Sequence, residues 1–252
     1  MSELPLYRLN KFISDTGICS RREADKYIEQ GQVSVNGVVA SVGTKVSQQD
    51  KVLVNGKPLP DKPKRVYLAY HKPVGITCTT ERHIHGNIID AIKYPQRIFP
   101  IGRLDKPSEG LIFLTNDGDI VNKILRAGNA HDKEYVVTVN KPITERFIQQ
   151  MSKGVPILDT VTLPCVVTQK SKQSFSIILQ QGLNRQIRRM CEYLGYEVQT
   201  LKRTRIMHIR LAGLKPGQWR LLDDIEIKML EAQLLNSSKT VSFAGPADSF
   251  DD

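Results

Sequence analysis

The sequence predicts an α+β protein in two parts: a small α+β module, then a larger domain with a mixed sheet and flanking helices. Residues 7–56 predict two amphipathic helices followed by short strands that meet at Asn-Gly turns. Residues 57–65 hold three prolines among alternating charges, which is typical of a linker. Residues 66–235 predict a series of strands with few helices. A chain of 252 residues is long enough for this division.

The helices of the N-terminal module are predicted from their apolar period and their end signals. The first helix has an apolar face and ends at Gly17. Ser20 followed by Glu23 has the spacing of a capping box, so a second helix starts there, and Gly31 ends it. The two Asn-Gly pairs that follow are strong hairpin signals.

The larger domain is predicted to be rich in strands. Strands are expected at residues 66–70, 110–115, 133–139, 165–168, 175–179 and 198–201. Helices are expected at 144–151 and at 185–194, the second with Asn184 as its cap. Residues 236–252 are small and polar with an acidic end, which predicts a mobile tail.

The charge and the cysteine content indicate which binding partners, sites and compartments are expected. Lysine and arginine outnumber aspartate and glutamate by 36 to 26, so the net charge of +10 attracts polyanions such as RNA, DNA or an anionic membrane. The four cysteines form no CxxC pair, which argues against a zinc site and a disulfide framework and suits a reducing compartment. The sequence has no signal peptide and no run of about 18 apolar residues, so a cytoplasmic location is expected.

The stretch Gly102 to Gly110, with the sequence GRLDKPSEG, is the most informative for chemistry. It predicts a loop before an apolar strand, with Asp105 held between a glycine and a proline and closely preceded by Arg103. A carboxylate fixed in this way could act as a nucleophile or a base. The alternative is a turn-forming aspartate, because surface loops are rich in Asp and Pro for conformational reasons.

Two groups of cations could bind phosphates. The two N-terminal helices carry a basic outer face made by Arg8, Lys11, Arg21, Arg22 and Lys26. The second group is expected to follow an RNA strand and comprises Lys202, Arg203, Arg205 and Arg210. Arg185 and Arg189 are expected to face outward from the helix at 185–194. The alternative is ordinary solvated helix faces, since acidic residues dilute the charge.

The segment His83-Ile84-His85-Gly86 is similar to a metal-binding pair and to the HIGH signature of class I aminoacyl-tRNA synthetases. We discount both. The segment has no carboxylate or cysteine partner at ligand spacing, and no second synthetase motif follows. A loop is the expected structure, and no metal is expected.

GRLDKPSEGLIFLTNDG resembles the catalytic-loop signature of the RsuA/RluF family of ribosomal RNA pseudouridine synthases. Three more stretches agree with that family in order and spacing: HKPVG at 71–75, KEY at 133–135 and GLNRQIRRM at 182–190. His71 is a departure, because the family usually has asparagine there. Residues 7–56 are similar to an S4 RNA-binding module, and only the tail falls outside the resemblance.

The resemblance implies a fold, an activity and a set of roles. The fold is an S4 module at 7–56, a linker at 57–65, and a mixed, mostly antiparallel sheet with flanking helices at 66–235. The implied roles are Asp105 as the essential carboxylate, Arg188 as its ion-pair partner, Tyr135 as the ring stacked on the target uracil, and Arg103 as a residue that holds the RNA helix open. Taken alone, Arg188 could equally well be a surface charge. For an isolated Lys-Glu-Tyr, a strand aromatic packed in the core is the favoured interpretation of Tyr135.

The expected function is therefore isomerisation of a uridine in structured, large-subunit ribosomal RNA, after the base is flipped out of its helix. No cofactor or metal is needed for this reaction. The protein is expected to act as a monomer away from membranes, and transfer RNA stays open as a second substrate. The alternative from another class is a non-catalytic S4-type RNA-binding factor in ribosome assembly.

Overall fold

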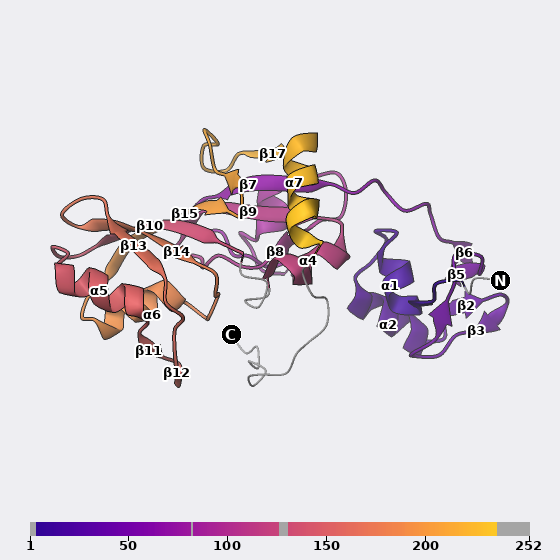
Figure 1. Ribbon diagram of the computed structural model, residues 1–252. Coiled ribbons are helices and arrows are strands. Elements are labelled where there is room, and N and C mark those ends of the chain that lie inside the picture. The colour runs from indigo at the N-terminus through magenta and orange to yellow at the C-terminus, as the bar shows by residue number, and fades with distance from the viewer. Residues whose placement is uncertain (1–3, 82, 126–130, 236–252) are drawn as a thin grey trace.

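The computed structural model describes residues 4–81, 83–125 and 131–235, so the predicted tail lies outside the described residues. A small N-terminal module lies at one end of the molecule and a larger body built on one long sheet at the other, with an extended segment between them (Figure 1). The predicted α+β class is confirmed. No helix in the described part of the chain is long and apolar enough to cross a membrane.

The N-terminal module packs two helices against short strands. Its elements are β1 (Tyr7–Arg8), α1 (Leu9–Ser14), α2 (Arg21–Glu29), β2 (Val33–Val35), β3 (Val38–Val39), β4 (Lys45–Val46), β5 (Val52–Val54) and β6 (Lys57–Pro58). The predicted capping box starts α2, with Ser20 and Glu23 bonded reciprocally. Leu9, Ile13 and Ile28 belong to the module's own apolar core, which is separate from the core of the body.

The body is organised around a nine-stranded sheet in the order β13-β14-β10-β15-β9-β7-β17, with β16 paired to β15 and β8 to β9. Its strands are β7 (Tyr67–Lys72), β8 (Phe99–Ile101), β9 (Glu109–Thr115), β10 (Lys133–Val139), β13 (Val166–Gln169), β14 (Ser174–Leu179), β15 (Val198–Ile206), β16 (Ile209–Arg210) and β17 (Trp219–Leu221). A separate hairpin joins β11 (Pro156–Ile157) to β12 (Thr160–Val161). Among the strands of this sheet that the structure describes, β15 and β9 alone pair in parallel, so the prediction of a mixed, mostly antiparallel sheet is confirmed.

Helices cover both faces of this sheet. They are α3 (Ile88–Ile92), α4 (Gly118–Leu125), α5 (Glu145–Lys153), α6 (Gln186–Tyr193) and α7 (Asp224–Leu234). Alternate residues of β7 enter two different cores: Leu68 joins the core of α5 and α6, and Ala69 joins the core of α4 and α7. All six residues of β7 are buried, as expected of a strand covered on both faces.

The two helices predicted in the body are confirmed as α5 and α6, whereas α3, α4 and α7 were not expected. Asn87 caps α3 by accepting from the amides of Ile89 and Asp90, and Asp223 forms a capping box with Glu226 at the start of α7. Asn184 does not cap α6, because Arg185 occupies the cap position in a left-handed conformation, without a capping hydrogen bond.

The segment 57–65 contacts the N-terminal module at its first residues and the body at its last residues. Lys57–Pro58 forms β6 on the edge of the N-terminal sheet. Farther along, Asn116 donates from Nδ2 to the carbonyl of Lys64 at 2.8 Å and accepts from the amide of Val66 at 3.0 Å. The extended connection between the two parts is therefore anchored to the body just before β7.

Candidate active site

Asp105 lies in the loop between β8 and β9, and hydrogen bonds hold this loop at three consecutive residues. The thiol of Cys78 donates to the carbonyl of Leu104 at 3.2 Å. The amide of Ser108 donates to the carbonyl of Asp105 at 2.9 Å, and the amide of Gly75 donates to the carbonyl of Lys106 at 2.8 Å. The backbone that presents Asp105 is therefore fixed, while its side chain is 35% exposed.

The side chain of Lys72 connects the stretch 71–75 to the Asp105 loop through hydrogen bonds. Its side chain is fully buried, and its ammonium donates to the carbonyls of Pro73 at 2.9 Å and Ile76 at 2.8 Å, with Lys106 O at 3.5 Å. Burial lowers the pKa of Lys72, and the charge of Asp105 is among the influences that oppose this. The Lys72 ammonium is thus a buried support of the loop.

Two guanidinium groups flank the Asp105 carboxylate. Nε of Arg188 and one terminal nitrogen of Arg185 each lie 3.9 Å from Oδ2 of Asp105. At this distance they are ion pairs and not hydrogen bonds. A terminal nitrogen of Arg188 donates to the carbonyl of Pro107 at 3.2 Å and to Oγ of Ser108 at 3.0 Å. Burial, and to a lesser degree the charge of Arg185, lowers the pKa of Arg188. Arg188 is only 14% exposed and holds the loop as well as its charge.

Arg185 was expected to face outward to RNA, and the structure places its side chain 45% exposed beside Asp105. The left-handed conformation of Arg185 turns the chain into α6 at this point. Arg189, also expected to face outward, donates to the backbone and side-chain oxygens of Asn184 at 3.1 and 3.3 Å. The start of α6 therefore supplies two cations to Asp105, where one was predicted.

Tyr135 and Arg203 face each other on neighbouring strands beside the loop. They are register partners in the β10–β15 pair, and the guanidinium carbon of Arg203 lies 5.9 Å from the centre of the Tyr135 ring. Tyr135 is 9% exposed and joins the core of the body. Arg203 donates from Nε to the carbonyl of Leu111 at 2.6 Å and reaches the carbonyl of Arg103 at 3.5 Å. Arg203 thus connects both ends of the Asp105 loop.

The second cationic group, predicted to follow an RNA strand, is only partly exposed. Arg203 is buried, so the prediction is wrong for this residue. Lys202 lies 3.6 Å from Glu109, and Arg205 pairs with Glu134 at 2.9 Å and with Asp132 at 3.6 Å. The carboxylates therefore compensate charges that were expected to meet phosphate. Arg210 is exposed, with Glu134 at 3.6 Å.

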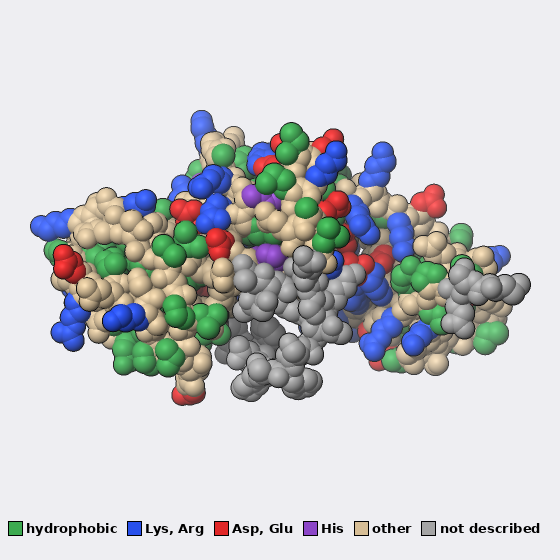
Figure 2. All heavy atoms as spheres, in the orientation of Figure 1, with side chains coloured by type: hydrophobic (Ala, Val, Ile, Leu, Met, Phe, Trp, Pro, Cys, Tyr) green, Lys and Arg blue, Asp and Glu red, His purple; other side chains and the backbone are tan. Residues whose placement is uncertain are grey.

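The basic face of the N-terminal module is largely exposed. Figure 2 shows lysine and arginine side chains gathered where this module faces the body. The exposed members of the face are Arg8, Arg21, Arg22 and Lys26. Lys11 differs, because it is half-buried between Asp15 at 2.7 Å and Asp119 at 3.3 Å. Lys11 therefore links the module to the body, which corrects its prediction as an outward cation.

Several residues of the site were not singled out from the sequence. Ser108 and Lys72 are fully buried polar residues that hold the loop, and Cys78 bonds to it through a thiol. Lys72 and Ser108 lie within the stretches that carry the family resemblance, so their position was a usable signal. Cys78 lies outside those stretches, and only the folded structure brings it to Leu104.

Family models match both parts of the chain. The RNA pseudouridylate synthase model matches residues 66–193, and the S4 domain model matches residues 8–52. The first match contains the loop, Tyr135 and the flanking cations Arg185 and Arg188. Because it covers the catalytic part, it supports an enzyme rather than the non-catalytic RNA-binding alternative.

Relatives of known name agree with these matches. The chain is 58% identical to the dual-specificity RNA pseudouridine synthase RluF of Escherichia coli strain K12, over 93% of this chain and 81% of that protein. It is 37% identical to the ribosomal large subunit pseudouridine synthase B of Bacillus subtilis strain 168, over 89% of this chain and 96% of that protein. A crystal structure of a pseudouridylate synthase superposes with a TM-score of 0.66 at 28% identity, covering 88% of this chain and 99% of that one. The chain therefore belongs to the RNA pseudouridine synthase family and carries an S4 domain before its synthase domain.

Proposed function

We propose that this pseudouridine synthase acts on a uridine in structured, large-subunit ribosomal RNA, with Asp105 as its catalytic residue. The single observation that carries the role of Asp105 is its setting: a partly exposed carboxylate on a fixed loop, with two guanidinium groups at 3.9 Å. The B. subtilis relative's name, a large-subunit pseudouridine synthase, supports the substrate. The proposal includes the domain limits 7–56 and 66–235, with the linker between them.

The reaction moves one bond and needs no net gain or loss of atoms. The bond from N1 of uracil to C1′ of ribose breaks, the ring turns, and C5 bonds to C1′ while the proton on C5 leaves and N1 gains one. A carboxylate close to both sugar and base can serve as the nucleophile or the base in this sequence. Arg188 and Arg185 stabilise the ionised form of such a carboxylate, because arginine keeps its charge when partly buried.

A uridine within an RNA helix must leave the stack to reach Asp105, at a cost of a few kcal/mol. Exposed Arg103, two residues before Asp105, is placed to contact the RNA that remains and to hold the helix open. Tyr135 borders the same loop through Arg203, and its ring is the aromatic surface proposed to contact the flipped uracil. Its low exposure predicts contact through one edge or face of the ring.

The proposal extends to partners and location. The exposed cations of the S4 domain would contact RNA phosphates. Such contacts raise the affinity for RNA but do not distinguish one base from another. The E. coli relative is named as dual-specific, so we propose a second RNA substrate, with transfer RNA as the candidate. Each chain carries a full set of these residues, so the proposed enzyme acts as a monomer, in the cytoplasm where it meets ribosomal RNA.

The direct test is Asp105→Asn, which keeps the size of the side chain and removes its charge. Tritium release from RNA labelled at uracil C5 should be lost in the variant, because no carboxylate is present. Binding of the same RNA should stay within a few-fold of the wild type, since the cations remain. Tritium release by the variant at the wild-type rate would refute the role of Asp105, and no release by the wild type would refute the substrate.

A further inference from the structure

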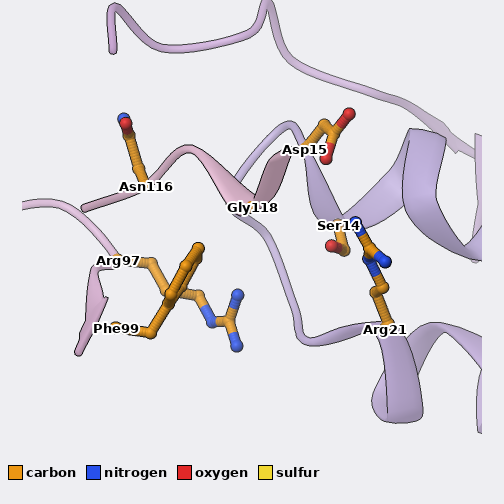
Figure 3. A pocket seen from close by; sticks show the side chains of 7 residues that line it. All are labelled: Ser14, Asp15, Arg21, Arg97, Phe99, Asn116 and Gly118. Carbon is orange, nitrogen blue, oxygen red and sulfur yellow. The ribbon is translucent and has the colours of Figure 1, made fainter. Parts of the chain in front are cut away.

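A cavity of about 190 Å³ lies between the S4 domain and the body, away from Asp105. Its walls come from both parts of the chain: Ser14, Asp15 and Arg21 on one side, and Arg97, Phe99, Asn116 and Gly118 on the other. In Figure 3 the Arg97 guanidinium extends from the body toward Ser14 and Arg21 of the S4 domain. The cavity exists only because the two domains meet here.

The charge of this cavity is positive. Asp15 is its acidic wall residue, and it is compensated by Lys11 at 2.7 Å and Lys62 at 3.7 Å. Arg21 and Arg97 have no ion pair with any acidic residue in the described part of the chain. Two arginines from two domains therefore face one space whose lining carboxylate, Asp15, is already paired with two lysines, and their mutual repulsion is unfavourable unless an anion or water screens it.

The remaining wall brings the two domains close together. Gly118, the first residue of α4, borders the cavity, and the carboxylate of Asp117 already accepts from the amide of Asp119 at this helix end, so the cationic character of the cavity comes from its arginines. A Cβ added to Gly118 would lie 3.4 Å from the Arg21 guanidinium, which shows how closely Arg21 approaches this helix end. Asn116 is occupied with the backbone of the linker, and Ser14 adds a hydroxyl at the opposite wall.

We propose that this cavity binds a phosphate group of the RNA backbone, held jointly by Arg21 and Arg97. Arginine binds phosphate through two parallel N–H donors, and the cavity presents two such groups. A phosphate bound by an arginine from each domain would fix the position of the S4 domain relative to the active site while the RNA is bound. The inference rests on the RNA substrate of the proposed function and is independent of the chemistry at Asp105.

The test is a double-mutant cycle on RNA affinity. Arg21→Gln, Arg97→Gln and the double variant are compared with the wild type, using a large-subunit ribosomal RNA fragment that the wild type converts. Each single variant should weaken binding roughly tenfold and reduce the slope of log affinity against log salt by about one. The double variant should lose much less than the product of the two single losses, because both arginines contact the same phosphate.

Controls separate this site from general charge effects. Arg146→Gln removes an exposed arginine on α5, at the other end of the molecule (Figure 1), and should change affinity little. Turnover at saturating RNA should stay at the wild-type value in Arg146→Gln. Wild-type affinity and salt slope in Arg97→Gln, or an equal loss in Arg146→Gln, would overturn the proposal.

A free anion is the other source of phosphate for this cavity. Inorganic phosphate at constant ionic strength should compete with RNA binding in the wild type and have less effect on Arg97→Gln. If inorganic phosphate raises the melting temperature of the wild type while Arg97→Gln binds RNA normally, the cavity holds a free ion and the RNA proposal is wrong. Failure of the proposed substrate would instead appear in the wild type, which would not convert the RNA fragment.

Discussion

At the scale of single residues, the two arginines next to Asp105 have different surroundings although their distances to the carboxylate are equal. Arg188 is largely buried and hydrogen-bonds to Pro107 and Ser108, so it supports both the charge and the shape of the loop. Arg185 is 45% exposed, so solvent screens its electrostatic attraction to the Asp105 carboxylate. We therefore expect the larger effect on catalysis from Arg188.

The first prediction compares the two positions by the same conservative change. Arg188→Lys keeps a cation and removes the fork that bonds Pro107 and Ser108, so turnover at saturating RNA should fall roughly 10- to 100-fold. Arg185→Lys should reduce turnover by less than roughly tenfold. Single-turnover pseudouridine formation measures both, with RNA affinity as a control. Equal losses in the two variants would contradict the proposed division of roles.

A second prediction concerns the pH dependence of stability. Burial lowers the pKa of Lys133 to about 8, whereas an unfolded lysine has a pKa of about 10.4. Between these values the unfolded chain holds a proton that the folded chain has lost, so this residue's contribution to the unfolding free energy rises with pH. The rise is roughly 1 kcal/mol per pH unit between pH 8 and 10.

Lys133→Met removes this titration while keeping an unbranched side chain. The unfolding free energy of the wild type minus that of Lys133→Met, from urea titrations at pH 7 to 10, should be constant below pH 8 and increase above it. Other groups, such as Tyr67, are common to both proteins and cancel in the difference. A difference that does not change with pH would mean that Lys133 titrates normally in the folded protein.

At the scale of elements, the pattern of apolar residues predicted the strands well. The predicted strand at 133–139 has the same limits as β10, and that at 175–179 is within one residue of β14. The predicted strand at 198–201 stopped too early, because β15 continues to Ile206 through a buried arginine, Arg203. A charged residue in a core position cannot be distinguished from a surface one by hydrophobic pattern alone.

The close contact of β9 with β15 is an element-scale feature that can be tested. Gly110 pairs with Arg203 in the parallel ladder and has a φ of +119°. A Cβ at this position would overlap the amide nitrogen and carbonyl oxygen of Arg203. Gly110→Ala should therefore lower the unfolding free energy by about 2–4 kcal/mol, from overlap and backbone strain together.

Gly182→Ala is the matched control, because a Cβ there meets no atom within 4 Å. Denaturant unfolding of both variants should show a clear loss for Gly110→Ala and a change within about 0.5 kcal/mol for Gly182→Ala. An unfolding free energy of Gly110→Ala equal to that of the wild type would show that the two strands can separate without cost.

At the scale of the whole molecule, the sequence predicted two parts and a connection, and its motifs predicted that Asp105, Arg188 and Tyr135 belong to one site. It could not predict that Lys11 would contact Asp119, because residues so far apart in the chain are brought together only by the fold. The same holds for the cavity between the domains and for the contact of Arg203 with both ends of the loop.

The role of Asp105 in modifying ribosomal RNA can be measured in cells that lack the gene. Pseudouridines in their large-subunit ribosomal RNA are mapped by carbodiimide-blocked primer extension, after complementation with the wild type or with Asp105→Asn. We expect a pseudouridine that is present with the wild type and absent with Asp105→Asn at equal protein level. Restoration of that pseudouridine by Asp105→Asn would contradict this role of Asp105.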